Sequence, residues 1–184
     1  MNSNVLELPQ SSKPPELITE SYREQNAELH RLRPDYGVNG HKHAPQIREL
    51  AMAIGAQSIL DYGCGKGTLA DALENMKVIN YDPAFGQWAM TPEPSDLVVC
   101  GDVMEHIEPE CLDAVLDDLA RVTKKCLFAN IATRPAVKTL PDGRNAHLIQ
   151  KDYVWWVNKM ASRFTIGSFH NMGGEVLMIC GAKQ

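Results

Sequence analysis

Hydrophobic and polar positions follow two periodicities along this chain. From residue 58 onward, short continuous apolar runs alternate with longer segments in which apolar residues recur every three or four positions. The apolar runs that predict strands are residues 58–62, 77–81, 96–100 and 126–133, and the amphipathic segments that predict helices are residues 68–75, 109–124 and 151–161. Strands that alternate with helices in this way predict a mostly parallel sheet covered on both faces.

The two ends of the chain depart from this alternation. Residues 1–16 are rich in Pro, Ser and Asn and predict a poorly ordered leader, and a helix is expected from 16 to 33, where Pro34 ends it. A second helix is expected at 45–54. We therefore divide the chain into a leader with a helical flap at 1–44 and a main domain at 45–184. Two final strands, 164–169 and 176–181, predict an antiparallel hairpin.

Composition and charge narrow the class of protein. The chain has 184 residues, which suits one domain, and its net charge of −5 argues against a surface built to bind nucleic acid phosphates. No apolar run approaches the roughly 18 residues that a membrane span needs, and the N-terminus lacks the pattern of a secretory signal. Five scattered cysteines, with no CxxC spacing, indicate reduced thiols. We expect a cytoplasmic protein without membrane partners.

The most informative segment begins at the end of the strand predicted at residues 58–62 and continues beyond it. There the chain reads Asp61-Tyr62-Gly63-Cys64-Gly65-Lys66-Gly67 before a helix begins. Gly63 and Gly65 allow the backbone to turn tightly and approach a ligand. The spacing G-x-G-x-G differs from the G-x-G-x-x-G of dinucleotide sites, and Gly67 stands where a P-loop has Ser or Thr. Asp61 would repel a phosphate but suits the ammonium group of an amino acid.

A second acid stands at the end of the next strand. Asp82 precedes Pro83, and a carboxylate in this position can accept hydrogen bonds from both hydroxyls of a ribose.

Together these features resemble the class I, Rossmann-like S-adenosylmethionine-dependent methyltransferases. Residues 59–67 (ILDYGCGKG) are similar to the first motif of that family, and residues 96–107 (DLVVCGDVMEHI) to its fourth-strand motif. The resemblance implies S-adenosyl-L-methionine as cofactor. The residues that it implies for cofactor binding are Asp61, Tyr62, Gly63, Cys64, Gly65, Gly67, Asp82, Pro83, Gly101, Asp102 and Val103.

The sequence departs from that family in one region. Residues 83–95 hold three prolines and are too short for the usual helix and third strand, so we expect a Rossmann-like α/β sheet shortened there. The third strand helps to bind adenine in the family. Phe85 and Trp88 can cover the adenine ring instead, or they can serve as core residues.

Two histidines are candidates for catalysis. His106 follows the fourth-strand motif, and His147 lies in the loop after the strand at 126–133, so both are expected at the same edge of the sheet. His147 resembles a histidine in small-molecule O-methyltransferases and is our first choice as a base, with a structural hydrogen-bonding role as the alternative.

The same segment raises the question of a metal ion. Asp102, Glu105 and His106, with a later His147, are similar to the metal site of the small-RNA 2′-O-methyltransferases, which have Glu in place of Asp102. Because a similar Asp-Val-x-Glu-His sequence is common in metal-free relatives, we assign no metal here.

The acceptor is less well defined than the cofactor. The chain carries no large insertion, so we expect a methyltransferase that acts on an oxygen or nitrogen of a small molecule, with nucleic acid disfavoured by the charge. Arg134 and Arg144 in the long loop 133–150 can bind an anionic acceptor or remain solvated. Two alternatives stay open: a non-catalytic S-adenosylmethionine-binding subunit of a larger complex, and an enzyme that cleaves S-adenosylmethionine.

Overall fold

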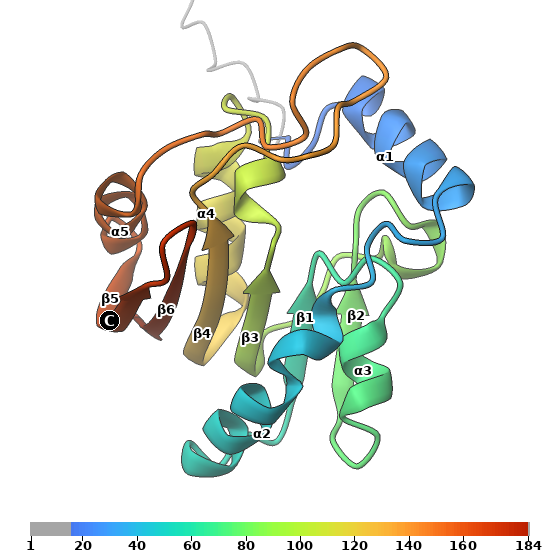
Figure 1. Cartoon of the computed structure of the whole chain (residues 1–184). Helices are drawn as coiled ribbons and strands as arrows, with labels where there is room; N and C mark the ends of the chain where they lie inside the picture. Colours follow the sequence, from blue (N-terminus) through green and yellow to red (C-terminus); the bar gives the residue numbers. More distant parts are fainter. Residues whose placement is uncertain (1–15, 184) are drawn as a thin grey trace, which may run out of the picture.

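A computed structural model describes residues 16–183 and shows one six-stranded sheet with the order β2-β1-β3-β4-β6-β5 (Figure 1). The strands are β1 (Ile59–Tyr62), β2 (Val78–Tyr81), β3 (Ser95–Gly101), β4 (Thr123–Ala132), β5 (Phe164–Asn171) and β6 (Glu175–Ala182). Strands β2, β1, β3 and β4 are parallel, and β6 pairs antiparallel with both β4 and β5. The predicted mostly parallel sheet with a C-terminal antiparallel hairpin is confirmed. The predicted leader lies almost wholly outside the described residues.

The shortened region between β2 and β3 is also confirmed. Within the described part of the chain, residues 82–94 contain a single 3-10 turn, η2 (Gly86–Trp88), and no strand. Pro83, Pro92 and Pro94 account for this, because each removes a backbone N–H that a strand would need.

Helices cover both faces of the sheet (Figure 1). The helices are α1 (Glu20–Leu32), α2 (Ala44–Ala53), α3 (Thr68–Ala72), α4 (Leu112–Val122) and α5 (Tyr153–Ala161), with 3-10 turns η1 (Gly40–His43) and η3 (Met104–His106). Helices α4 and α5 pack on one face of the sheet, while α2 and α3 pack on the other. No described helix has the length and apolarity to cross a bilayer.

The alternation of side chains along β1 divides the core in two. Ile59 packs with α2 and α3, whereas Leu60 and Tyr62 face α4 and α5. Asp61 therefore shares the face of Ile59 at the carboxyl end of the strand. The amphipathic segment predicted at 109–124 becomes a helix only at Leu112, since residues 109–111 form a turn before it.

Helix α1 and the long loop after β4 lie together over the carboxyl ends of the parallel strands (Figure 1). Tyr22 of α1 is buried in a small cluster with Leu140 and Ala146 of the loop. The start of α1 is held by Glu108, whose carboxylate accepts hydrogen bonds from both the backbone N–H and the hydroxyl of Thr19, each at 2.8 Å. The predicted flap is thus docked on the loop that follows β3.

Candidate active site

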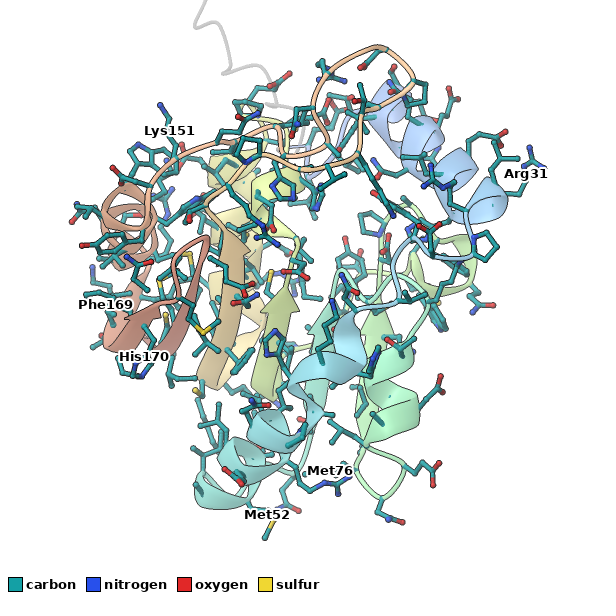
Figure 2. The ribbon with its side chains drawn as sticks, in the orientation of Figure 1. Arg31, Met52, Met76, Lys151, Phe169 and His170 are labelled. Atoms are coloured by element: carbon teal, nitrogen blue, oxygen red, sulfur yellow. The ribbon has the colours of Figure 1, made fainter. Side chains whose placement is uncertain are left out.

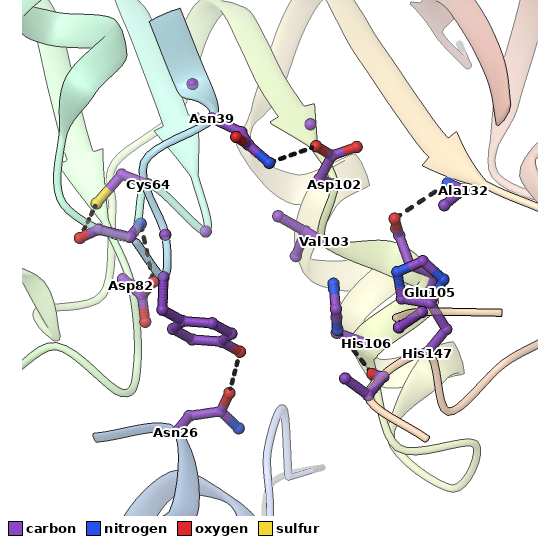
Figure 3. A pocket seen from close by; sticks show the side chains of 18 of the residues that line it. Asn26, Asn39, Cys64, Asp82, Asp102, Val103, Glu105, His106, Ala132 and His147 are labelled. Atoms are coloured by element: carbon purple, nitrogen blue, oxygen red, sulfur yellow. Dashed lines mark hydrogen bonds between the residues drawn. The ribbon is translucent and has the colours of Figure 1, made fainter. Parts of the chain in front are cut away.

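A cavity of about 360 Å³ opens at this edge of the sheet. The glycine turn after β1 and the residues after β2 bound one side of it, and the loop after β3 and the loop after β4 bound the other. Helix α1 and residues 35–40 cover it. Figure 3 shows Asp82 and Cys64 on one side, with Glu105, His106 and His147 on the other.

The glycine turn is shaped by close contacts on two sides. Gly63 and Gly65 have φ values of +78° and +53°. A Cβ on Gly63 would lie 2.4 Å from Cγ2 of Val103, and a Cβ on Gly65 would lie 2.5 Å from the carbonyl oxygen of Gly37. Only glycine fits these two positions, because both the backbone conformation and the neighbouring atoms exclude a side chain.

Asp61 presents a buried carboxylate to the cavity. The residue is 5% exposed, and its Oδ2 atom has no hydrogen-bond partner among the described residues. Burial, with the nearby charge of Asp82, raises the pKa of Asp61 to about 7. An unpaired carboxylate oxygen in a cavity wall is matched by a cationic ligand group, which would supply the missing partner and favour the ionised form.

Asp82 is held directly after β2. Its Oδ2 accepts a hydrogen bond from the backbone N–H of Gly65 at 3.0 Å, and its Oδ1 accepts one from Ala84 at 2.9 Å. Burial raises the pKa of Asp82. Since each carboxylate oxygen can accept a second hydrogen bond, Asp82 can still bind a pair of hydroxyl groups.

The loop after β3 contributes the middle of the cavity wall. Gly101, Asp102 and Val103 all line it. Asp102 is the one non-glycine residue with positive φ in the described part of the chain, at +55°. Its carboxylate accepts hydrogen bonds from Asn130 at 3.1 Å and from Asn39 at 3.4 Å, which fixes this unusual conformation.

His106 and His147 stand edge to face, with ring centroids 4.8 Å apart. The Nδ1–H of His106 donates to the carbonyl oxygen of Ala146 at 2.7 Å. The Nδ1–H of His147 donates to the backbone carbonyl oxygen of Arg134 at 2.6 Å. Because a carbonyl can only accept, each ring has a proton on Nδ1, and in the neutral form of the ring the Nε2 atom keeps its lone pair. Burial and the adjacent His147 lower the pKa of His106 to about 4, so this ring is neutral at pH 7.

Glu105 lies beside the two rings and is fully buried. Its Oε1 accepts a hydrogen bond from the backbone N–H of Ala132 at 3.0 Å, and its Oε2 has no partner in residues 16–183. Burial raises the pKa of Glu105 to about 8.

Comparison with known proteins identifies the fold and the family. A family model described as a methyltransferase domain matches residues 17–172. The chain belongs to this methyltransferase domain family. No curated protein matches the sequence significantly.

Several solved methyltransferases share the fold at low identity. The 1,6-didemethyltoxoflavin-N1-methyltransferase of Burkholderia thailandensis, bound to 1,6-didemethyltoxoflavin and S-adenosylhomocysteine, has a TM-score of 0.66 and 14% identity, covering 97% of this chain and 94% of that chain. The N-methyltransferase NodS from Bradyrhizobium japonicum, in complex with S-adenosylhomocysteine, has a TM-score of 0.60 and 14% identity. That match covers 88% of this chain and 99% of NodS. An rRNA methylase from Escherichia coli has a TM-score of 0.53 and 14% identity. That match covers 90% of this chain and 78% of the methylase.

Most residues that the motif suggested for the cofactor line the cavity of this methyltransferase domain, but two do not. The side chain of Tyr62 points into the core, where its hydroxyl donates to Asp118 at 2.9 Å. Gly67 lies at the start of α3, where a Cβ would meet Asn80 and Trp88. Both residues support the glycine turn from beneath, and neither forms part of the cavity wall.

Phe85 and Trp88, for which the sequence left open a place over adenine or in the core, are half-buried outside the cavity wall. Phe85 and Trp88 stack on each other with ring centroids 4.9 Å apart, and neither lines the cavity. Phe85 contacts the edge of His30, which does line it. The cavity wall next to Asp82 is formed instead by Pro83 and Ala84.

Helix α1 supplies two cavity residues, Asn26 and His30, that sequence reasoning missed. Asn26 and His30 line the cavity together with Tyr22, and the hydroxyl of Tyr36 donates to Asn26 at 2.8 Å. The Nε2 atom of His30 lies 4.0 Å from the Asp82 carboxylate, and burial lowers the pKa of this histidine. The spacing of Tyr22, Asn26 and His30 at intervals of four residues places them on one helix face, and this was the signal available in the sequence.

The two arginines of the long loop differ in position. Arg134 lines the cavity, as does Lys138, whose ammonium group pairs with Asp35 at 3.1 Å. Arg144 lies outside the lining, pairs with Asp142 at 2.7 Å and packs over the ring of Tyr22. Of the two arginines that the sequence suggested for an anionic acceptor, only Arg134 therefore lies at the cavity wall.

Proposed function

We propose that this methyltransferase domain binds S-adenosylmethionine between the glycine turn and Asp82, and that a small molecule is methylated on oxygen or nitrogen beside His106 and His147. The observation that carries this proposal is one continuous cavity with an unpaired carboxylate, Asp61, at one end and two free imidazole nitrogens at the other. The similar proteins crystallised with S-adenosylhomocysteine support the cofactor assignment.

Each cofactor-binding residue has a chemical role in this proposal. Asp61 pairs with the ammonium group of the methionine moiety, and the open backbone at Gly63 and Gly65 lets the ligand approach closely. Asp82 accepts the ribose hydroxyls with the lone pairs that Gly65 and Ala84 leave free. When bound, S-adenosylmethionine supplies a methyl group on a positively charged sulfur.

The chain's own contribution to the reaction is alignment and proton handling. Helix α1 and residues 35–40 line one side of the cavity and shield that side from solvent. Holding two reactants in line supplies much of the rate of a displacement reaction. An acceptor that loses a proton can pass it to Nε2 of His147, or to that of His106, since both lone pairs are free.

A small acceptor suits the dimensions and charge of the site. The cavity of about 360 Å³ lies at the low end of the range for small-molecule sites, roughly 300–1,000 Å³, and must hold the cofactor too, which leaves room for only a small acceptor group. The net charge of −5 disfavours nucleic acid. Arg134 and Lys138 stand on the acceptor side and favour an acceptor that carries an anionic or carbonyl group.

Calorimetric titration with S-adenosylhomocysteine tests the cofactor site. We expect binding by the unchanged protein, a loss of affinity of about 100-fold or more in Asp61→Asn, since a buried charge pair is broken, and no change in Asp71→Asn, an exposed control on α3. Absence of binding by the unchanged protein, or equal binding by both variants, refutes the proposal. Incubation with cofactor labelled on the methyl group, followed by mass analysis of candidate acceptors, then tests transfer.

A further inference from the structure

Three side chains with metal-binding atoms meet at the acceptor end of the cavity. Glu105 and His106 come from η3, and His147 comes from the loop after β4. One ligand atom of each lies within 4.8 Å of those of the other two. Figure 3 shows the two rings next to the Glu105 side chain.

Each of these side chains is oriented by a backbone group. The N–H of Ala132 donates to Oε1 of Glu105, while the carbonyl oxygens of Ala146 and Arg134 accept from His106 and His147. Histidines that bind metals usually donate the second ring N–H to a carbonyl or carboxylate, which fixes the tautomer. Both histidines here already have that partner.

The atoms left over are the ones that a metal ion needs. The Oε2 atom of Glu105 is buried and has no hydrogen-bond partner in the described residues, and the Nε2 atoms of both rings keep their lone pairs. A buried carboxylate oxygen without a partner carries a substantial free-energy cost. A bound cation would remove that cost.

Asp102 does not belong to this group. Its carboxylate is not among the ligand atoms that lie within 4.8 Å of one another there, and its hydrogen bonds from Asn130 and Asn39 hold the conformation of the loop after β3. The four residues that the sequence suggested therefore separate into three candidate ligands and one structural acid.

We propose that Glu105, His106 and His147 bind a divalent transition metal ion of the Zn²⁺ type, with one coordination position open to the cavity. Two imidazoles and one carboxylate suit Zn²⁺, Mn²⁺, Fe²⁺ or Co²⁺, whereas Ca²⁺ and Mg²⁺ prefer oxygen ligands alone. Ligand bonds of about 2.0–2.1 Å place tetrahedral ligand atoms roughly 3.3 Å apart, so the three donors must draw together. His147, which lies on a loop, supplies that adjustment.

This inference leaves the proposed cofactor site unchanged, but with the ion bound it replaces the base role proposed above for His106 and His147. A metal-bound Nε2 cannot accept a proton, so metal binding and base catalysis are alternative uses of the same lone pairs. The open position faces the cavity, where an oxygen or nitrogen of the acceptor would complete the coordination.

Titration of chelator-treated full-length protein tests the site. We expect one equivalent of Zn²⁺ to bind by calorimetry at pH 7.5. One equivalent of Co²⁺ should give the visible bands of a low-coordinate nitrogen and oxygen site. Thiolate absorption is expected to be absent, because all five cysteines are buried and none is in the group. Failure of both ions to bind at this stoichiometry, or a thiolate signature, overturns the proposal.

Variants locate the ion. His147→Ala and Glu105→Gln should each lower Zn²⁺ affinity by more than about 100-fold, beyond what loss of an outer hydrogen-bond partner costs. His170→Ala is the matched control, since this histidine lies on the edge strand β5 away from the cavity (Figure 2), and this variant should bind Zn²⁺ normally.

His147 is partly exposed, so its variant should keep the fold, which circular dichroism and S-adenosylhomocysteine binding check. Unchanged Zn²⁺ binding by folded His147→Ala overturns the proposal. Loss of S-adenosylhomocysteine binding by the unchanged protein would count against the proposed function alone.

Discussion

Gly37 and Gly65 cross so closely that a Cβ on Gly65 would lie 2.5 Å from the carbonyl oxygen of Gly37 and 2.7 Å from its Cα atom. The backbone N–H of Lys66 donates to that same carbonyl at 2.8 Å, and the ammonium group of Lys66 donates to the carbonyls of Arg33 and Pro34. Residues 33–37, which lead into the segment that covers the cavity, are therefore hydrogen-bonded to the glycine turn and packed against it, although the two are far apart in the sequence.

Gly65→Ala is expected to displace this cover. The new methyl group meets backbone atoms that cannot rotate away, and the position has φ of +53°, so we expect a loss of about 1–3 kcal/mol in the free energy of unfolding. Weaker S-adenosylhomocysteine binding should accompany it. Gly86→Ala is the control, because a Cβ there meets nothing within 4 Å. Equal melting temperatures and affinities for the two variants would show that the crossing is not tight in solution.

The pKa of Asp61 makes cofactor binding depend on pH. Burial raises this pKa to about 7 in the free protein, and pairing with an ammonium group requires the ionised carboxylate. Affinity for S-adenosylhomocysteine should therefore fall as pH drops below 7, by about tenfold per pH unit, and level off above 7. Calorimetry from pH 5.5 to 8.5 measures this. Asp61→Asn should remove the Asp61 component, leaving any contribution from Asp82.

The Asp61 carboxyl group should affect stability in the opposite direction: rising pH strengthens cofactor binding but weakens the folded state. An acid whose pKa is raised in the folded state binds its proton more tightly there, so its contribution to stability declines as pH rises from about 4 to about 7. Replacing Asp61 by Asn should therefore raise the melting temperature of the free protein at pH 8 and leave it nearly unchanged at pH 4. Thermal unfolding of both proteins across this range is the measurement, and a variant that is less stable at pH 8 would contradict the prediction.

The sequence predicted features that are local in the chain. Apolar runs located the strands, and the prolines after Asp82 explained the shortened region, because both effects act within a few residues. Tyr62 could also have been excluded from the cavity wall in advance. It shares the face of Leu60 in β1, whereas Asp61 points to the opposite face.

Features that arise from docking were beyond such reasoning. His30 reaches Asp82 only because α1 lies across the carboxyl edge of the sheet, and no local pattern fixes where a helix docks. In the same way, Asp102 and Glu105 are neighbours in one motif, yet Asn39 and Asn130 draw the first away from the histidines. Those partners come from distant segments, so the spacing alone could not separate the two acids.

Glu108 should control how firmly α1 covers the cavity. Its carboxylate accepts from both the N–H and the hydroxyl of Thr19, which is the N-cap residue of the helix that carries Asn26 and His30. Glu108→Ala leaves two donors without a partner, so we expect faster hydrogen exchange in residues 19–32 and faster dissociation of S-adenosylhomocysteine. Glu110→Ala, an exposed neighbour, is the control. Exchange rates in α1 that match those of the control would mean that the cluster around Tyr22 holds the helix without this anchor.

Asn145 is expected to set the position of both histidines without touching the cofactor end. Its Oδ1 accepts from the backbone N–H groups of Ala136 and His147, and its Nδ2 donates to the carbonyl of Ala136, all at 2.9 Å. These bonds hold the two arms of the loop whose carbonyls orient the rings. Asn145→Ala should cost about 1–3 kcal/mol in stability, because three part-buried backbone groups lose their hydrogen-bond partner. Nitrogen NMR of the imidazoles should show both tautomers in place of the Nδ1–H form. The dissociation constant of S-adenosylhomocysteine should stay within about twofold of the unchanged protein, since Asn145 does not line the cavity. Asn158→Ala on the exposed side of α5 is the control. Imidazole spectra identical in the two variants would show that Asn145 does not position these rings.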